Sequence, residues 1–238
     1  MNATADGVPH TLPDSPHAPT SPFGLLRDRA RVFQRIADGQ DLVPVMVRCL
    51  ATAGAGAAIL GMALGSYAHS AAQILASTLK LPILLLGTAL LCFPAFHVLQ
   101  SWRAPRPMSL QRSLTLQSLS LAAVALVWGS LAPPILFLVG STQHYRLTQS
   151  LAVLVCAFGG LVGLSVLLTG YRELCDPEQQ RPSLGLLLYV LVFGAVGGQL
   201  AWILRPFVGS PALPFQLFRA PNPEDGNFFL ALLDLLGW

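Results

Sequence analysis

The sequence predicts an all-α protein, a polytopic bundle of helices embedded in a membrane. Three observations lead to this prediction. No aspartate or glutamate occurs between Leu42 and Arg172. The 238 residues are 53% apolar and 11% charged, with a mean hydropathy of +0.60, and this is about half the charge of a typical soluble domain. The few cations in the acid-free region separate long apolar runs instead of interrupting them.

Five apolar runs predict five transmembrane helices within a bundle over residues 42–204. We expect them at about residues 49–68, 81–100, 115–140, 149–170 and 184–204. At about 1.5 Å per residue, each covers the roughly 30 Å of a bilayer core. The first run is the least hydrophobic, because alanine and glycine fill most of residues 51–58. If it failed to insert, the N-terminus would lie on the opposite side.

The residues before the bundle predict two different segments. Residues 1–21 are polar and rich in proline, without the apolar stretch of a secretory signal, and indicate a disordered tail. Residues 22–41 predict an amphipathic juxtamembrane helix, with most of its arginines away from an apolar face made of Leu25, Leu26, Val32, Phe33 and Ile36. That face either enters the membrane interface, with arginines near anionic headgroups, or packs on the cytoplasmic ends of the bundle.

Cations predict the orientation, because lysine and arginine resist translocation across the membrane. With the N-terminus in the cytoplasm and the C-terminus outside, ten cations are internal and four are external. The internal ones are Arg27, Arg29, Arg31, Arg35, Arg48, Arg103, Arg106, Arg112, Arg172 and Arg181, and the external ones are Lys80, Arg146, Arg205 and Arg219.

Three pairs of glycines, each four residues apart, predict close helix packing. A pair with this spacing removes two side chains from one face and lets a neighbouring backbone approach. We therefore expect the first, fourth and fifth spans to form the tight core, within one chain or between copies. The pairs are Gly61 and Gly65, Gly159 and Gly163, and Gly194 and Gly198.

Prolines and polar residues within the spans are few. Pro94, Pro133 and Pro134 indicate helix bends, which either shape the bundle or border a cavity. Four further residues are candidates for a polar bundle interior, through hydrogen bonds between helices. They are His97, Gln117, Tyr189 and Gln199.

Lys80, the only lysine, is expected at the start of the second span. Its side chain either extends toward the outer headgroups, so that the ammonium group stays hydrated, or contacts an anion or lipid phosphate. Arg205 and Arg219 are the other candidates for such a contact. Both lie in residues 205–238, which predict an aromatic and proline-rich segment on the outer face followed by a short apolar helix.

The stretch after the fifth span carries a resemblance. Trp202, Leu204-Arg205-Pro206-Phe207, Gly209-Ser210-Pro211, Pro214-Phe215 and Leu217-Phe218-Arg219 resemble the C-terminal block of an uncharacterised family of bacterial multi-span membrane proteins. Lys80-Leu81-Pro82 with Pro94 is similar to the second span of that family. The resemblance covers about a quarter of the chain and implies no established activity.

Yip-type proteins are similar in topology alone, with five spans and a cytosolic N-terminus. Their Asp-Leu-Tyr-Gly-Pro block is not found here, and the nearest run is Asp41-Leu42-Val43-Pro44. No residue role of that family therefore applies to this chain.

The sequence predicts a non-enzymatic protein without a catalytic site, cofactor or metal site, because no carboxylate is available within the spans for acid/base chemistry. Proton-coupled transporters usually carry an ionisable group there. We expect a scaffold or assembly subunit in the cell membrane, of the bacterial inner membrane type. Its partners would be membrane lipids and either further copies or another membrane protein, and not nucleic acid. The alternative is a transporter, permease or channel component that handles a small solute, anion or lipid headgroup.

Overall fold

The described part of the chain is built from helices. The computed structural model describes residues 29–39, 41–101, 108–141, 144–174, 184–209 and 216–218. Its helices are α2 (Arg29–Asp38), α3 (Leu42–Gly65), α4 (Ala71–Ser101), α5 (Leu110–Ser141), α6 (Tyr145–Leu174) and α7 (Leu184–Leu204), with the 3-10 turn η1 (Ser66–Ala68) after α3. Within these ranges there is no strand, and the five helices from α3 to α7 are long and apolar enough to cross a membrane. The predicted all-α fold with five such helices is thus confirmed.

Several predicted segments lie outside the described residues. These are the tail at 1–21, the first part of the amphipathic helix at 22–28, and most of residues 205–238, including Arg219.

α4, α5 and α6 extend beyond the predicted spans at both ends, α3 begins earlier than predicted but ends at Gly65, and α7 has the predicted bounds. The largest difference is in α4, which begins at Ala71 and contains Pro82 in its interior. Gln73 and Ser77 lower the hydropathy of this first part, and for that reason the apolar run begins later in the sequence. Both side chains are nevertheless buried. The helix continues through them because they have partners inside the protein.

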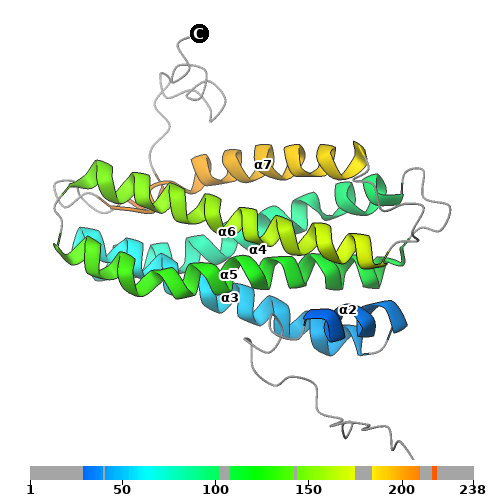
Figure 1. The fold of residues 1–238 in the computed structure, drawn as a ribbon. Coiled ribbons are helices and arrows are strands. Elements are labelled where there is room, and N and C mark those ends of the chain that lie inside the picture. The colour runs from blue at the N-terminus through cyan, green and yellow to red at the C-terminus, as the bar shows by residue number, and fades with distance from the viewer. Residues whose placement is uncertain are drawn as a thin grey trace, which may run out of the picture.

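The five long helices lie side by side (Figure 1). α2 lies at one end of the bundle, called the α2 end below, and residues 205–209 lie at the other. α5 is the central helix, and every side chain from residue 115 to residue 125 is buried. α3 and α6 pack on α5, α3 also packs on α4, and α7 packs on α4 at the edge of the bundle.

This arrangement differs from the expected core of the first, fourth and fifth spans. Among the described residues, α3, α6 and α7 do not pack extensively against one another. α5 lies between α3 and α6, and α7 is the least buried of the five long helices. A glycine pair allows close packing only where another helix covers it. The pair itself does not specify which helix that is.

The alanine and glycine residues of α3 form its contact with α5. Ala53 and Ala57 are fully buried, and a Cβ atom at Gly56 would overlap the carbonyl group of Ala125. Gly129 of α5 lies opposite Gly56, since a Cβ atom at Gly129 would be 3.6 Å from the Cα atom of Gly56. The low hydropathy of this run therefore reflects small side chains that bring two helix backbones together.

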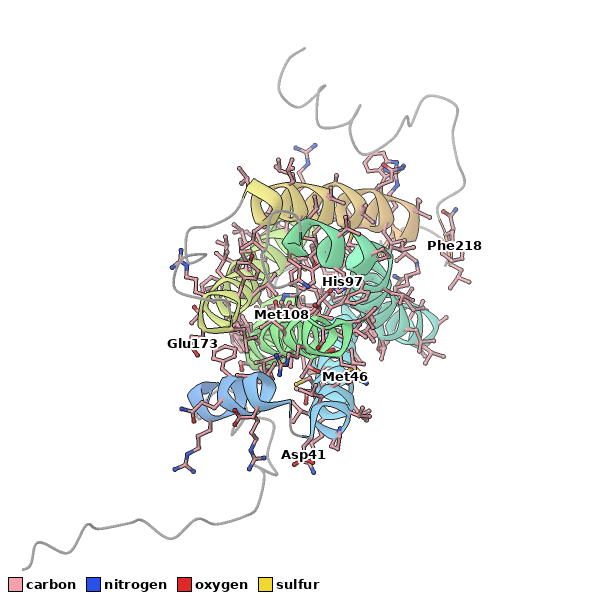
Figure 2. All side chains as sticks on the ribbon, turned by 90° about the vertical axis from the view of Figure 1, so that its right-hand side faces the viewer. Asp41, Met46, His97, Met108, Glu173 and Phe218 are labelled. Carbon is pink, nitrogen blue, oxygen red and sulfur yellow. The ribbon has the colours of Figure 1, made fainter. Side chains whose placement is uncertain are left out.

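α2 packs on the bundle through its apolar face. Val32, Phe33 and Ile36 are buried among residues of α5 and α6. Gly39, in the left-handed region with φ of 73°, ends the helix, and its N–H donates to the carbonyl oxygen of Ile36 at 3.3 Å. Figure 2 looks along the bundle, and α2 lies across that view. Of the predicted apolar face, the described residues Val32, Phe33 and Ile36 pack against the protein, and Leu25 and Leu26 lie outside the described residues.

Candidate functional site

The most unusual backbone in the described residues is a segment, here called the strap, formed by residues 205–209. α7 ends at Leu204 because Pro206 has no N–H and disfavours a helical conformation at Arg205. The strap then runs toward the beginning of α4. A Cβ atom at Gly209 would be 2.7 Å from Cγ of Gln73 and 2.8 Å from Cβ of Ala68. Only glycine allows the strap to lie this close to α4.

α4 presents three polar side chains to the strap. Gln73, Ser77 and Lys80 are spaced by four and three residues, which places them on one helical face. Ser77 Oγ donates to the carbonyl oxygen of Phe207 at 2.6 Å, and Lys80 Nζ donates to that of Pro206 at 3.2 Å. Gln73 Nε2 donates to the carbonyl oxygen of Pro206 at 3.3 Å and to that of Phe207 at 3.4 Å. Non-helical carbonyl groups in an apolar environment need such donors, because an unpaired one is costly.

Lys80 is the only charged side chain among the buried polar residues of the described ranges, with 3% of its surface exposed. Its ammonium nitrogen lies 5.3 Å from the centroid of the Phe218 ring, within the range of a cation–π contact. The described acidic residues are Asp38, Asp41 and Glu173, all at the opposite end of the bundle. A carbonyl oxygen and an aromatic ring thus stabilise this charge, where a carboxylate would be the usual partner.

The structure places two of the three candidate lipid or anion contacts at the strap. Arg205 is its first residue, and its guanidinium carbon lies 3.4 Å from the centroid of the Trp202 ring. Lys80 bonds to the next residue, Pro206. The third candidate, Arg219, lies outside the described residues.

His97 belongs to a separate polar cluster nearer the α2 end. His97 Nδ1 shares hydrogen bonds with Ser113 Oγ and Gln100 Nε2, each at 3.3 Å. Gln100 also donates to Ser113, and the ring of Phe93 stacks on the imidazole at 6.1 Å. This cluster joins α4 to α5, and His97 is labelled among the central helices in Figure 2.

The other three polar candidates are dispersed along the bundle. Gln117 Nε2 donates to the carbonyl oxygen of Ala89 at 3.0 Å, next to the part of α4 that Pro94 interrupts. The ring of Tyr189 packs on that of Phe96 at 4.8 Å. Gln199 of α7 has a buried Oε1 atom without a hydrogen-bond partner among the described residues. The structure does not bring these residues together with Lys80 into one polar interior.

The six glycines differ in what covers them. Cβ atoms at Gly61 and Gly65 would meet the backbone of α4, at Ser77 and Ile74 respectively. Cβ atoms at Gly159 and Gly163 would overlap side chains of α5, those of Trp128 and Val124. At Gly194 a Cβ atom would meet nothing within 4 Å, and Gly198 of the same helix is half-buried.

Lys80 and residues 205–238 were singled out from the sequence, but their contact was not predicted. Gln73 and Ser77 lie before the predicted second span at 81–100 and were not assigned a role. The signal that could have found them is their spacing with Lys80, which is that of one helical face. Close contacts at Gly56 and Gly185 were also missed, and a Cβ atom at Gly185 would overlap the carbonyl group of Leu99.

Comparison with known proteins assigns neither a family nor a function to this chain. Among the described residues, no group of three His, Cys, Asp or Glu side chains could hold a metal ion. No protein-family profile, curated protein or solved structure matches the chain. The resemblance to a bacterial membrane protein family therefore stays a prediction.

Proposed function

We propose that this protein is a non-enzymatic scaffold or assembly subunit of a complex in the cell membrane, of the bacterial inner membrane type. The observation that supports the proposal best is the position of α7. This helix packs on α4 along one side, lies at the edge of the bundle, and is the least buried of the five long helices. A helix attached in this way has room for a second partner.

α7 carries glycines on two sides. Two of them face α4, and one lies on the uncovered side. On the α4 side, a Cβ atom at Gly185 would overlap Leu99, and one at Gly197 would be 3.3 Å from Cγ2 of Thr88. On the uncovered side, Gly194 is open to its surroundings and Leu191 is exposed. Small residues in membrane helices favour close contact with another helix. We propose that a helix of a second copy, or of another membrane protein, packs at Gly194.

The alternative, a component that transports or channels a solute, anion or lipid headgroup, has less support. Lys80 would be its main anion contact, yet the ammonium group already bonds to Pro206 and faces the Phe218 ring. Arg205 is stacked on Trp202. An anion would have to displace these contacts.

A leucine at Gly194 tests the proposal. We expect the full-length protein, purified in mild detergent, to be isolated as a complex, and Gly194→Leu to weaken that complex by about 5-fold or more, as about 1–3 kcal/mol of overpacking implies. The measurement is the mass of the particle by native mass spectrometry over a range of concentrations. Gly160→Leu is the matched control, because Gly160 of α6 is also open within 4 Å.

The same experiment can reject the proposal. A wild-type protein that is monomeric and has no co-purifying partner would contradict it, and so would a Gly194→Leu variant that forms the complex as the wild type does. Identical weakening by Gly160→Leu would show that added bulk anywhere on the surface is responsible.

A further inference from the structure

The polar face of α2 carries two arginines directed away from the bundle. Arg31 is exposed and Arg35, one turn later, is partly exposed. Val32 and Ile36 are buried, and the two arginines lie beside this buried face, on the more exposed side of the helix. Figure 2 shows nitrogen-tipped side chains of α2 that point away from the other helices. Because α2 lies across the bundle axis, this direction is sideways, in the plane of a membrane that the bundle crosses.

The contacts of Phe33 give the depth of α2. Its ring and the side chain of Leu116 both lie where a Cβ atom at Gly170 would be. A helix rises about 1.5 Å per residue along its axis. Leu116 is therefore about 9 Å from the start of α5, and Gly170 about 6 Å from the end of α6. α5 is about 48 Å long and the bilayer core about 30 Å thick, so a centred α5 extends about 9 Å beyond the core at each end. α2 therefore lies at the level where hydrocarbon meets headgroups.

Among the described residues, cations outnumber acids at this end of the molecule. Arg48, Arg112 and Arg172 from three further helices accompany Arg31 and Arg35, whereas the described acids are Asp38, Asp41 and Glu173. None of these arginines forms an ion pair with those acids. The first turns of α3 also expose Val43 and Val47, at 54% and 55%. Guanidinium groups that form no ion pair with the described carboxylates thus occur beside apolar surface, a combination that suits a phospholipid.

We propose that Arg31 and Arg35 bind the phosphate groups of anionic phospholipids beside α2. A guanidinium group forms two parallel hydrogen bonds with a phosphate, and the phosphate groups of lipids lie at this depth in a membrane that the bundle crosses. The apolar face of α2 is used for packing on the bundle, so the bundle itself holds the arginines at headgroup depth. This site is independent of the contact proposed for α7.

The test compares two lipids with the same acyl chains on the full-length protein. Phosphatidylglycerol and phosphatidylcholine are added to the purified protein, and retained lipids are counted by native mass spectrometry. We expect the wild type to prefer phosphatidylglycerol and the Arg31→Gln/Arg35→Gln variant to bind it about 25-fold more weakly, at about 5-fold for each arginine. Arg31→Lys/Arg35→Lys should keep part of the preference. Arg146→Gln, an exposed arginine at the other end of the bundle, should keep all of it.

A salt series provides a second readout that general damage to the fold would not produce. Rising salt should weaken phosphatidylglycerol binding to the wild type and leave the residual binding of the double glutamine variant nearly unchanged. Equal retention of both lipids by the wild type, equal binding by the double glutamine variant and the wild type, or an equal loss in Arg146→Gln would each overturn the proposal. Loss of an acidic protein partner, with lipid binding unchanged, would overturn it as well.

Discussion

Lys80 illustrates how one charged side chain is held inside an apolar bundle. A buried ammonium group loses its hydration, and this loss has to be offset by local partners. Its partners are the carbonyl oxygen of Pro206 and the ring of Phe218. Both belong to the chain after α7, so the charge links α4 to that part of the chain. Ser77 and Gln73 form the same link, one and two turns away from Lys80 respectively.

Ser77→Ala tests whether these bonds hold the strap. The substitution removes the donor to Phe207, and we expect a loss of about 0.6 kcal/mol, up to about 1.7 kcal/mol, in the free energy of unfolding. We also expect faster amide hydrogen exchange in residues 207–209. Unfolding in mixed micelles and exchange mass spectrometry measure the two effects.

Ser130→Ala is the control, because Ser130 is exposed and its hydroxyl donates to Leu126 of its own helix at 2.6 Å. An equal loss in both variants, or unchanged exchange in the strap of Ser77→Ala, would contradict the role assigned to Ser77.

The contact of α3 with α5 shows how a pair of helices depends on missing side chains. Gly56 lies directly on the backbone of Ala125, and Gly129 leaves space on the other helix. Gly54, only two residues from Gly56, lies on a different side of α3, where a Cβ atom would be 4.0 Å from Cδ1 of Leu86. The same residue type therefore meets a covering backbone at one position of this run and has room for a side chain at another.

Alanine substitutions at these two glycines should change stability in opposite directions. We expect Gly56→Ala to destabilise the protein by about 1–3 kcal/mol, because the added methyl group overlaps backbone that cannot move away alone. Gly54→Ala should be neutral or stabilising by up to about 1 kcal/mol, since alanine is the better helix former and the site has room. The measurement is unfolding in mixed micelles. Equal effects of the two substitutions would argue against the close contact at Gly56.

The whole molecule has two chemically different ends. The α2 end carries arginines from four helices, whereas the strap end has Lys80, Arg146 and Arg205 as its described cations. Five helices could cross a membrane, and α2 and the strap lie at opposite ends of these helices. The excess of arginine at the α2 end predicts that this end faces the cytoplasm.

Reporter fusions test this topology. A reporter fused before Met1 should be active in the cytoplasm, and one fused after Trp238 should be active only outside. The reason is that cations resist translocation and five crossings place the two ends of the chain on opposite sides. Cytoplasmic activity of the reporter after Trp238 would show that the number of crossings is even.

The positions of the long helices could be predicted from the sequence, but their full lengths could not. α7 has the predicted bounds, because no charged residue or proline occurs from 184 to 204. α4 begins earlier than predicted, because Gln73, Ser77 and Lys80 reduce the hydropathy of a segment whose polar groups are paired with the strap. The residues of that site were visible in the sequence, while their partner was not, since it lies more than 120 residues later in the chain.

The sequence alone predicted the all-helical class and the number of long helices. Local properties were sufficient for this, namely the acid-free region, the apolar runs and the positions of arginine. The choice of neighbours was decided by the tertiary structure, which places α5 at the centre, α7 at the edge and the strap on α4. The physical reason is that side chains facing lipid and side chains facing another helix are equally apolar. Hydropathy cannot separate them, whereas the fit of one surface to another can. Gly56 and Gly194 are both glycines within apolar runs of the sequence. Gly56 is nevertheless covered by the backbone of another helix, whereas Gly194 is open.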